Sequence, residues 1–301
     1  MNVDVDGVSR SVTVVGEPGG EGTRALVLVF HGSRQDGPGH RAFTGKAYDA
    51  LAQQGAVVAY LDGYRGNWND ARRLSAFPAR LAGIDDTGFA RAVVDALVAS
   101  HGVDRQRVFA VGYSNGGQMV LRLVHEAPGL LAGAAVIAAT MPEPEDFLVP
   151  DGPGPAVPLP VLLVHGAKDR IAPYQGGEMS RWARAVFKVG GSMRSAPETA
   201  AYFAHRNGIT AEPARTTVSG PHRGWRRTWV ERTRHAQDGL APVDLYTVHG
   251  GGHTVPGPRS APFVLGATNH DVSAAELVSE FFGLDGRSRR SPGLVSPAPA
   301  P

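Results

Sequence analysis

The sequence predicts an α/β fold built on a mostly parallel, doubly wound sheet that helices cover on both faces. Short apolar runs recur along the chain without polar alternation, which is typical of strands buried on both faces. Amphipathic segments with helical spacing separate these runs, as expected where helices connect parallel strands. The 301 residues, 42% hydrophobic and 19% charged, can bury such a core in one domain.

The first element is a predicted β-hairpin. Val3 and Val5 precede the pair Asp6-Gly7, and further valines follow it at positions 12, 14 and 15. An Asp-Gly pair between short runs rich in β-branched residues favours a two-residue turn, so we expect the chain to begin with two antiparallel strands.

The parallel sheet follows in order along the chain. Its strands are predicted at residues 25–30, 56–61, 108–111, 134–139, 160–164 and 243–248. Helices are predicted at 87–101, where Phe89, Val93, Val94 and Leu97 have helical spacing, and at 118–125. This alternation predicts parallel strands whose carboxyl ends lie at one edge of the sheet.

Three stretches interrupt the alternation. Residues 142–160 are rich in proline and predict a surface loop. Residues 170–240 are too long for a simple crossover and predict an insertion that covers one end of the sheet, with arginines on a solvated face. Residues 286–301 predict a disordered tail, which leaves 1–285 as a single domain.

The end of the insertion predicts another hairpin. Residues 224–235 alternate in the manner of a strand, and Gln237-Asp238-Gly239 predicts a turn into the strand at 243–248. Trp225 and Trp229 then lie on one face, and we expect that face to pack beneath the insertion rather than to form a wall of the site.

Composition excludes several classes of function. A net charge of +2 does not favour nucleic acid as a partner, and the absence of cysteine excludes disulfides, thiolate metal sites and a cysteine nucleophile. No phosphate-binding loop, dinucleotide-binding motif or HExxH motif is present, so we expect neither a cofactor nor a metal. The amino terminus has no basic, apolar leader and no long apolar run follows, which predicts a cytoplasmic protein without a membrane partner.

The strongest chemical motif is Gly112-Tyr113-Ser114-Asn115-Gly116, a GxSxG pattern. Chance matches occur in a chain with 39 glycines, but this one follows a predicted strand and precedes a predicted helix. That strand-to-helix turn exposes a nucleophilic serine, and small residues on both sides avoid collisions with the neighbouring strand and helix. We therefore predict that Ser114 is a nucleophile.

A serine nucleophile needs a base and a carboxylate that orients the base. Asp169 follows the strand at 160–164, and His253 follows the strand at 243–248 through a glycine-rich turn. Both therefore belong to the carboxyl edge of the sheet, in the chain order Ser, Asp, His. His165 and His249 also lie near strand ends, and we expect both to be structural.

An oxyanion formed at this site would need two backbone donors. The amide of Asn115 is one, because it follows the nucleophile at the start of a helix. The loop after the strand at 25–30, His31-Gly32-Ser33, is expected to supply the second, and we favour the amide of Ser33.

Four motifs together resemble the polyhydroxybutyrate-depolymerase-like and feruloyl esterases of the α/β-hydrolase superfamily. They are His31-Gly32 with Gln35, the run 112–119 (GYSNGGQM), His165-Gly166 with Asp169, Pro173 and Tyr174, and the run 250–257 (GGGHTVPG). The resemblance implies that Ser114, Asp169 and His253 form a catalytic triad, in an α/β-hydrolase fold with an insertion before the last strand. Many members are extracellular, which is the alternative location.

Substrate contacts are predicted from the same loops. Trp68 follows the strand at 56–61 toward the carboxyl edge, and an aromatic residue there can line a pocket. Tyr113, Tyr174 and Val255 are the other candidates, with Val255 standing where the family usually has tryptophan. The expected substrate is a small or oligomeric ester of hydroxyalkanoate, acetyl or feruloyl type.

These observations predict a serine carboxylic-ester hydrolase that works through an acyl-enzyme. A serine peptidase of the prolyl-oligopeptidase type would use the same three residues, so it is the alternative enzyme. A noncatalytic binding module on the same fold is the third hypothesis, although binding alone does not require an intact triad. The sequence does not specify an oligomeric state.

Overall fold

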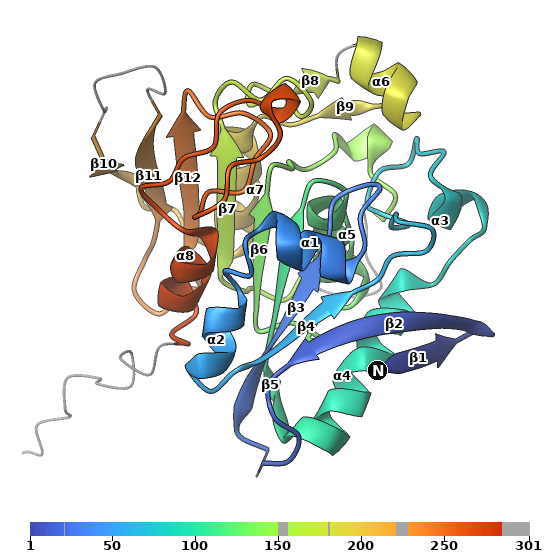
Figure 1. Cartoon of the computed structure of the whole chain (residues 1–301). Coiled ribbons are helices and arrows are strands. Elements are labelled where there is room, and N and C mark those ends of the chain that lie inside the picture. Colours follow the sequence, from blue (N-terminus) through green and yellow to red (C-terminus); the bar gives the residue numbers. More distant parts are fainter. Residues whose placement is uncertain (21, 150–155, 180, 221–227, 285–301) are drawn as a thin grey trace, which may run out of the picture.

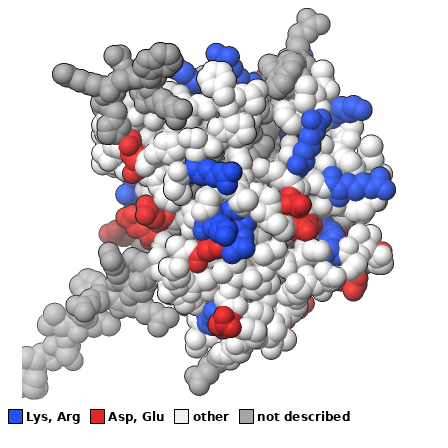
Figure 2. Space-filling model, in the orientation of Figure 1, with Lys and Arg blue, Asp and Glu red and all other residues white. Residues whose placement is uncertain are grey.

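The computed structural model describes residues 1–20, 22–149, 156–179, 181–220 and 228–284. It confirms the predicted α/β class, with one large sheet between two layers of helices (Figure 1). Within those ranges no helix combines the length and the apolar character needed to cross a membrane. On the face drawn in Figure 2, basic and acidic side chains are interspersed.

Ten strands form the main sheet in the order β1-β2-β4-β3-β5-β6-β7-β12-β11-β10. The six in the middle are parallel, and the two pairs at the edges run antiparallel to their neighbours. The strands are β1 (Asn2–Val5), β2 (Val8–Val15), β3 (Arg24–Phe30), β4 (Val57–Leu61), β5 (Val103–Tyr113), β6 (Gly133–Ile137), β7 (Val161–Gly166), β10 (Ala214–Ser219), β11 (Trp229–His235) and β12 (Val243–His249).

Helices cover both faces of this sheet. On one face α4, α5 and α7 pack against a core that contains Leu28, Phe89 and Phe203, and on the other α1, α2 and α8 pack around Val29 and Leu51. The helices are α1 (Gly37–Phe43), α2 (Asp49–Gln53), α3 (Pro78–Leu81), α4 (Asp86–His101), α5 (Asn115–Glu126), α6 (Arg181–Phe187), α7 (Ala196–Arg206) and α8 (Ala274–Phe281).

The predicted strands of the parallel sheet are all present, and two of the differences in extent have a local explanation. β5 begins at Val103, five residues before its apolar run, and most of these first residues are polar and at least partly exposed, so they do not read as part of that run. β6 ends at Ile137 rather than at 139, since Ala138 has a positive φ of 52° that turns the chain out of the sheet. Both differences arise at strand ends, where the run of buried apolar residues and the strand do not have the same limits.

Both predicted hairpins are confirmed. Asp6 and Gly7 have φ values of 50° and 76°, as a two-residue turn between β1 and β2 requires. β11 pairs antiparallel with β12 after a turn at Gly239, but β11 begins at Trp229. Trp225 lies outside the described residues, so its predicted place beside Trp229 stays a prediction.

The stretch 170–240 contributes in three ways. Its last part forms β10 and β11, which extend the main sheet, and α7 packs on β7 and β12. Its first part, with α6 and the small sheet of β8 (Gly177–Glu178) and β9 (Ser192–Met193), lies beyond the carboxyl ends of the strands (Figure 1). The described part of the proline-rich stretch 142–160 holds only one turn of 3-10 helix, at Pro144–Asp146.

Candidate active site

Ser114 occupies a sharp turn between β5 and α5. Its φ of 54° and ψ of −115° lie outside the conformations that a serine normally adopts, so surrounding contacts must hold it there. One contact is the hydrogen bond from its backbone N to the carbonyl of Ile137 on β6, at 2.9 Å. This turn places the hydroxyl at the carboxyl edge of the sheet, near the switch point between β3 and β5.

Glycines at positions 112 and 116 make the turn possible. A Cβ atom on Gly112 would lie 2.2 Å from the carbonyl oxygen of Gly116, and one on Gly116 would lie 2.1 Å from the carbonyl oxygen of Phe30. Each distance is far below van der Waals contact and involves backbone that cannot move aside. The steric role predicted for these glycines therefore agrees with the structure.

The structure brings Ser114, His253 and Asp169 together from three separate loops. The Nδ1 of His253 lies 2.7 Å from Oδ2 of Asp169, and its Nε2 lies 2.8 Å from the Oγ of Ser114. An ionised carboxylate can only accept, so Nδ1 carries the proton and Nε2 is free to accept one from the serine. This is the arrangement in which a histidine can act as a base toward Ser114.

Asp169 remains ionised although it is buried. Burial raises the pKa of its carboxyl group, but the electrostatic interaction with His253 and the hydrogen bonds outweigh this effect, and the net shift is downward. Its second oxygen, Oδ1, accepts hydrogen bonds from the backbone N of Ile171 at 2.8 Å and of Ala172 at 2.9 Å. These contacts hold the carboxylate in one orientation and leave Oδ2 for the histidine.

The backbone of His253 is fixed on both sides. Its N donates to the carbonyl of Leu265 at 2.7 Å, and its carbonyl accepts from the hydroxyl of Tyr113 at 2.8 Å. Burial raises the pKa of Tyr113, so the phenol keeps its proton and stays a donor. Tyr113 therefore supports the loop that carries His253.

The two competing histidines have structural contacts. His165 is fully buried, burial lowers its pKa, and its Nε2 lies 2.8 Å from the carbonyl of Ala172 but 3.6 Å from Asp169. His249 stacks face to face on Trp229, with ring centroids 3.7 Å apart. Neither histidine is bonded to Ser114, in agreement with the structural role expected for both.

Two backbone amides point to an oxyanion site beside Ser114. Asn115 is the first residue of α5, so its N–H has no acceptor within the helix. In the described part of the chain no hydrogen bond engages the N–H of Ser33, whereas its neighbours Gly32 and Arg34 both donate. Ser33, Asn115 and Ser114 border the same small recess.

His31 anchors the loop that carries Ser33. Burial lowers its pKa to about 4, so the ring is neutral at pH 7. Its Nε2 accepts from the backbone N of Gly63 at 2.8 Å, which places the ring proton on Nδ1, where it donates to the carbonyl of Gly32 at 2.7 Å. The histidine therefore joins the loops after β3 and β4.

The structure corrects the predicted substrate contacts. Trp68 is completely buried, and its indole N–H donates to the carbonyl of His31 beneath the site. Tyr113 and Val255 are also buried, and the hydroxyl of Tyr174 is hydrogen-bonded to the hydroxyl of Thr247. None of the four lines the recess at Ser114: Trp68, Tyr113 and Val255 are directed into the interior, and Tyr174 is partly buried beside β12.

Other side chains line that small recess. Four of them are apolar: Phe77, Ile171, Met179 and Phe187. The fifth is Arg72, which the sequence analysis did not single out. Ile171 follows Asp169 by two residues and was within reach of sequence reasoning, but no local pattern indicates that Phe77, Met179, Phe187 or Arg72 would meet at Ser114.

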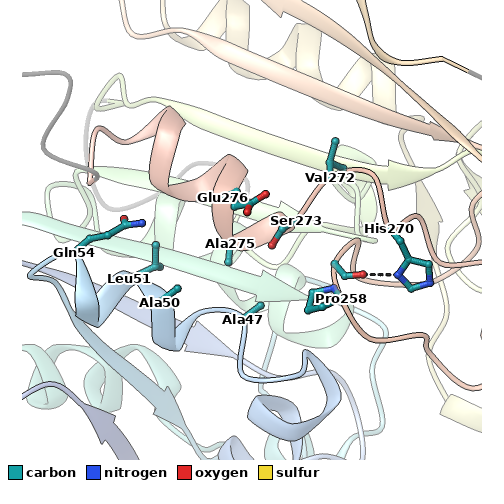
Figure 3. A pocket seen from close by; sticks show the side chains of 11 residues that line it. Ala47, Ala50, Leu51, Gln54, Pro258, His270, Val272, Ser273, Ala275 and Glu276 are labelled. Carbon is teal, nitrogen blue, oxygen red and sulfur yellow. Dashed lines mark hydrogen bonds between the residues drawn. The ribbon is translucent and has the colours of Figure 1, made fainter.

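A larger cavity of about 330 Å³ lies elsewhere, between α2 and α8 (Figure 3). Its walls include Leu51, Gln54, His270 and Glu276, and the ring of His270 is held by the carbonyl of Gly257 at 2.6 Å. The three residues of the triad are absent from these walls. We therefore assign the chemistry to the smaller recess, which contains the serine.

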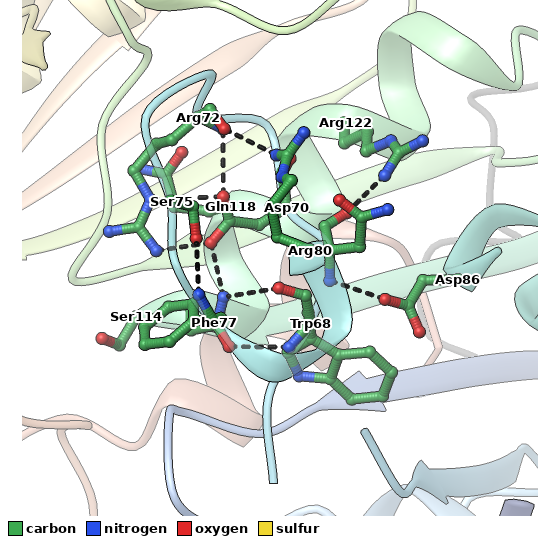
Figure 4. A network of polar contacts seen from close by, with 12 residues as sticks. Trp68, Asp70, Arg72, Ser75, Phe77, Arg80, Asp86, Ser114, Gln118 and Arg122 are labelled. Carbon is green, nitrogen blue, oxygen red and sulfur yellow. Dashed lines mark hydrogen bonds and ion pairs between the residues drawn. The ribbon is translucent and has the colours of Figure 1, made fainter. Parts of the chain in front are cut away.

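Buried polar contacts connect the loop 67–80 to the start of α5 (Figure 4). The carboxylate of Asp70 accepts from the side-chain N of Asn115 at 2.5 Å and pairs with Arg72. The side-chain O of Asn115 accepts from the backbone N of Trp68 at 2.9 Å. Through Asn115, the turn at the nucleophile is therefore fixed to the loop that supplies one wall of the recess.

Comparisons with known proteins agree with this geometry. Residues 67–197 match the phospholipase/carboxylesterase family. Over 293 residues the chain is 33% identical to "Putative esterase NocK" of Nocardia uniformis subsp. tsuyamanensis, a match that covers 93% of this chain and 80% of the relative. It is 29% identical to feruloyl esterase B of Piromyces equi over 211 residues, or 68% of this chain and 35% of that protein.

Among solved structures, the acetyl xylan esterase from Aspergillus awamori superposes with a TM-score of 0.59 at 16% identity, over 91% of this chain and 93% of that one. This likeness shows the fold. Together with the sequence relative matched over nearly the whole chain, it shows that this protein belongs to the carboxylesterases of the α/β-hydrolase fold.

Proposed function

We propose that this esterase hydrolyses carboxylic esters through an acyl-enzyme on Ser114, with His253 as the base and Asp169 as the group that orients it. The observation that carries the proposal is the unbroken hydrogen-bonded chain from Ser114 Oγ through the His253 ring to Asp169. The amides of Ser33 and Asn115, which border the same recess, serve as the oxyanion donors.

The reaction then proceeds in two halves. Ser114 Oγ attacks the ester carbon while Nε2 of His253 takes its proton, and the carbonyl oxygen becomes an oxyanion at the two amides. Collapse breaks the bond to the alcohol, which leaves with the proton from Nε2. Water then attacks the acyl-serine with the help of the same nitrogen, the acid departs, and Ser114 regains its proton.

The proposed substrates are esters with a short acyl group of hydroxyalkanoate, acetyl or feruloyl type. The four apolar side chains that line the small recess favour a compact acyl group over a long chain. The names of two similar proteins, a feruloyl esterase and an acetyl xylan esterase, support the same range.

The test compares Ser114→Ala with the wild type and with Ser100→Ala, an exposed serine on α4 that serves as a matched control. We expect Ser114→Ala to fold normally, to lose hydrolysis of p-nitrophenyl acetate by at least about a thousandfold, and to escape labelling by a fluorophosphonate. Full activity in that variant would refute the mechanism.

A substrate panel separates the alternatives. Esters should be hydrolysed in preference to proline-containing peptide amides, and the opposite preference would identify a peptidase of the prolyl-oligopeptidase type. Failure of the wild-type protein to react with the fluorophosphonate would favour a noncatalytic binding role.

A further inference from the structure

Arg72 is an unusual residue for the wall of a small esterase site. Among the described residues that line the recess at Ser114, it is the one that carries a charge. Only 7% of the residue is exposed, so its guanidinium has lost most of its contact with bulk water. A charge in such a place must be balanced by neighbouring groups or used on a ligand.

One neighbour holds the guanidinium firmly. Nε of Arg72 donates to Oδ1 of Asp70 at 3.2 Å, Nη2 pairs with Oδ2, and the backbone N of Arg72 also donates to Oδ1 at 3.0 Å. The guanidinium carbon lies 5.5 Å from the ring centroid of Phe77, itself a wall of the recess. These contacts fix the direction of the side chain before any ligand binds.

The third nitrogen, Nη1, is not used by the protein. Within the part of the chain that the structure describes, no hydrogen bond or ion pair engages it, and it is not among the fully enclosed polar atoms without a partner. The side chain keeps 9% of its surface accessible, and Arg72 borders the recess. Nη1 is therefore a positioned donor that remains open toward the site.

The surrounding network contains further arginines and carboxylates. Arg80 donates to the backbone carbonyls of Asp70 and Arg72, both at 2.6 Å, and so belongs to the same network (Figure 4). The buried polar groups around it continue the network to β2 and α5. Counted together, four guanidinium groups face three carboxylates: Arg10, Arg72, Arg80 and Arg122 against Asp70, Asp86 and Glu126.

We propose that Arg72 makes this esterase selective for esters that carry a carboxylate close to the scissile bond. The inference rests on the proposed function, because it takes Ser114 as the reacting atom. The free Nη1 attracts the anion, while Phe77, Ile171, Met179 and Phe187 pack on the few carbons between it and the ester. The carboxylate can belong to the acyl part or to the alcohol.

Matched substrate pairs test the proposal on the wild-type enzyme and distinguish the two positions. For the acyl side, mono-p-nitrophenyl glutarate is compared with its methyl ester, which has similar length and no charge. For the alcohol side, 4-acetoxybenzoate is compared with its methyl ester. After subtraction of spontaneous hydrolysis, we expect kcat/KM to favour the anion in one pair by about 10-fold to 100-fold.

Variants then assign the preference to Arg72. Arg72→Gln should reduce the ratio of anionic to neutral kcat/KM by the same factor. Arg72→Lys keeps a charge beside Asp70 with fewer directed donors, so it should fold and retain an intermediate ratio. Arg73→Gln is the matched control, since it removes an exposed arginine from the same loop, and its ratio should equal that of the wild type.

Three results would overturn the inference. The first is a wild-type enzyme that shows no preference for the anionic ester in either pair. The second is an Arg72→Lys or Arg72→Gln variant that loses activity equally on anionic and neutral esters, which would indicate a structural or oxyanion role. The third is failure on all four esters, which would refute the proposed function as well, whereas hydrolysis of the methyl esters without a charge preference refutes this inference alone.

Discussion

Removal of one oxygen atom from Tyr113 tests how the base is held in place. In Tyr113→Phe the ring keeps its stacked contacts with His40 and Phe43, whose centroids lie 5.7 and 5.4 Å away. The change removes only the hydroxyl that donates to the carbonyl of His253 at 2.8 Å. Any effect therefore reports on that hydrogen bond.

The structure sets the size of the effect. A buried carbonyl left without its donor costs about 1–3 kcal/mol of unfolding free energy. The His253 backbone keeps its other anchor, the bond from its N to Leu265, so the loop shifts rather than opens. A base displaced by about 1 Å can lose on the order of 100-fold in rate, and with one anchor intact we expect kcat to fall about tenfold while KM changes little.

The assay measures kcat and KM with p-nitrophenyl acetate together with urea unfolding. Tyr48→Phe is the matched control, because the hydroxyl of Tyr48 is equally buried but has no hydrogen-bond partner in the described structure. Its removal should leave stability unchanged or raise it. The reasoning is refuted if Tyr113→Phe behaves as Tyr48→Phe does, or if it loses stability with no change in kcat.

Two further predictions concern the hairpin and acid conditions. Trp229→Ala removes the ring that stacks on His249, at the end of β12 before the His253 loop. The variant should have a lower melting temperature and a lower kcat but the same ranking of acyl substrates. A changed ranking with an unchanged melting temperature would contradict this. Burial lowers the pKa of His31 and His125 from 6.5 to about 4, and that of His40 to about 3. The unfolded chain therefore binds more protons below pH 6.5, and urea unfolding should show stability falling as pH drops toward about 4, by up to about 1.4 kcal/mol per pH unit for each histidine; a pH-independent free energy would exclude this.

Local pattern was enough to predict the sheet and the three residues that meet at the site. Apolar runs locate strands because both faces are covered, and parallel strands bring their carboxyl ends to one edge. Ser114, Asp169 and His253 each follow such an end, so their positions in the sequence predict that they lie close together. The role of the glycines at the turn could also be predicted, because the steric limits of a tight turn depend on nearby residues.

The walls of the recess could not be predicted in this way. The loop after β4 leaves the correct edge, but its course depends on distant partners: Trp68 turns inward to the carbonyl of His31, and Arg72 is fixed by Asp70. A neighbouring Asp and Arg in a loop normally indicate solvated charges. Only the tertiary arrangement shows that this pair is buried beside the nucleophile.

The double attachment of Asp70 limits how this enzyme can diverge. The same carboxylate holds Arg72 at the recess and Asn115 at the nucleophile turn, so replacement of Arg72 alone leaves the buried Asp70 without its ion-pair partner near the catalytic serine. A lineage that moves to neutral esters through this recess must therefore exchange residues 70 and 72 together or pass through a less stable intermediate. In directed evolution, libraries that vary the two positions jointly should yield stable variants with an altered substrate range more often than single-site libraries do.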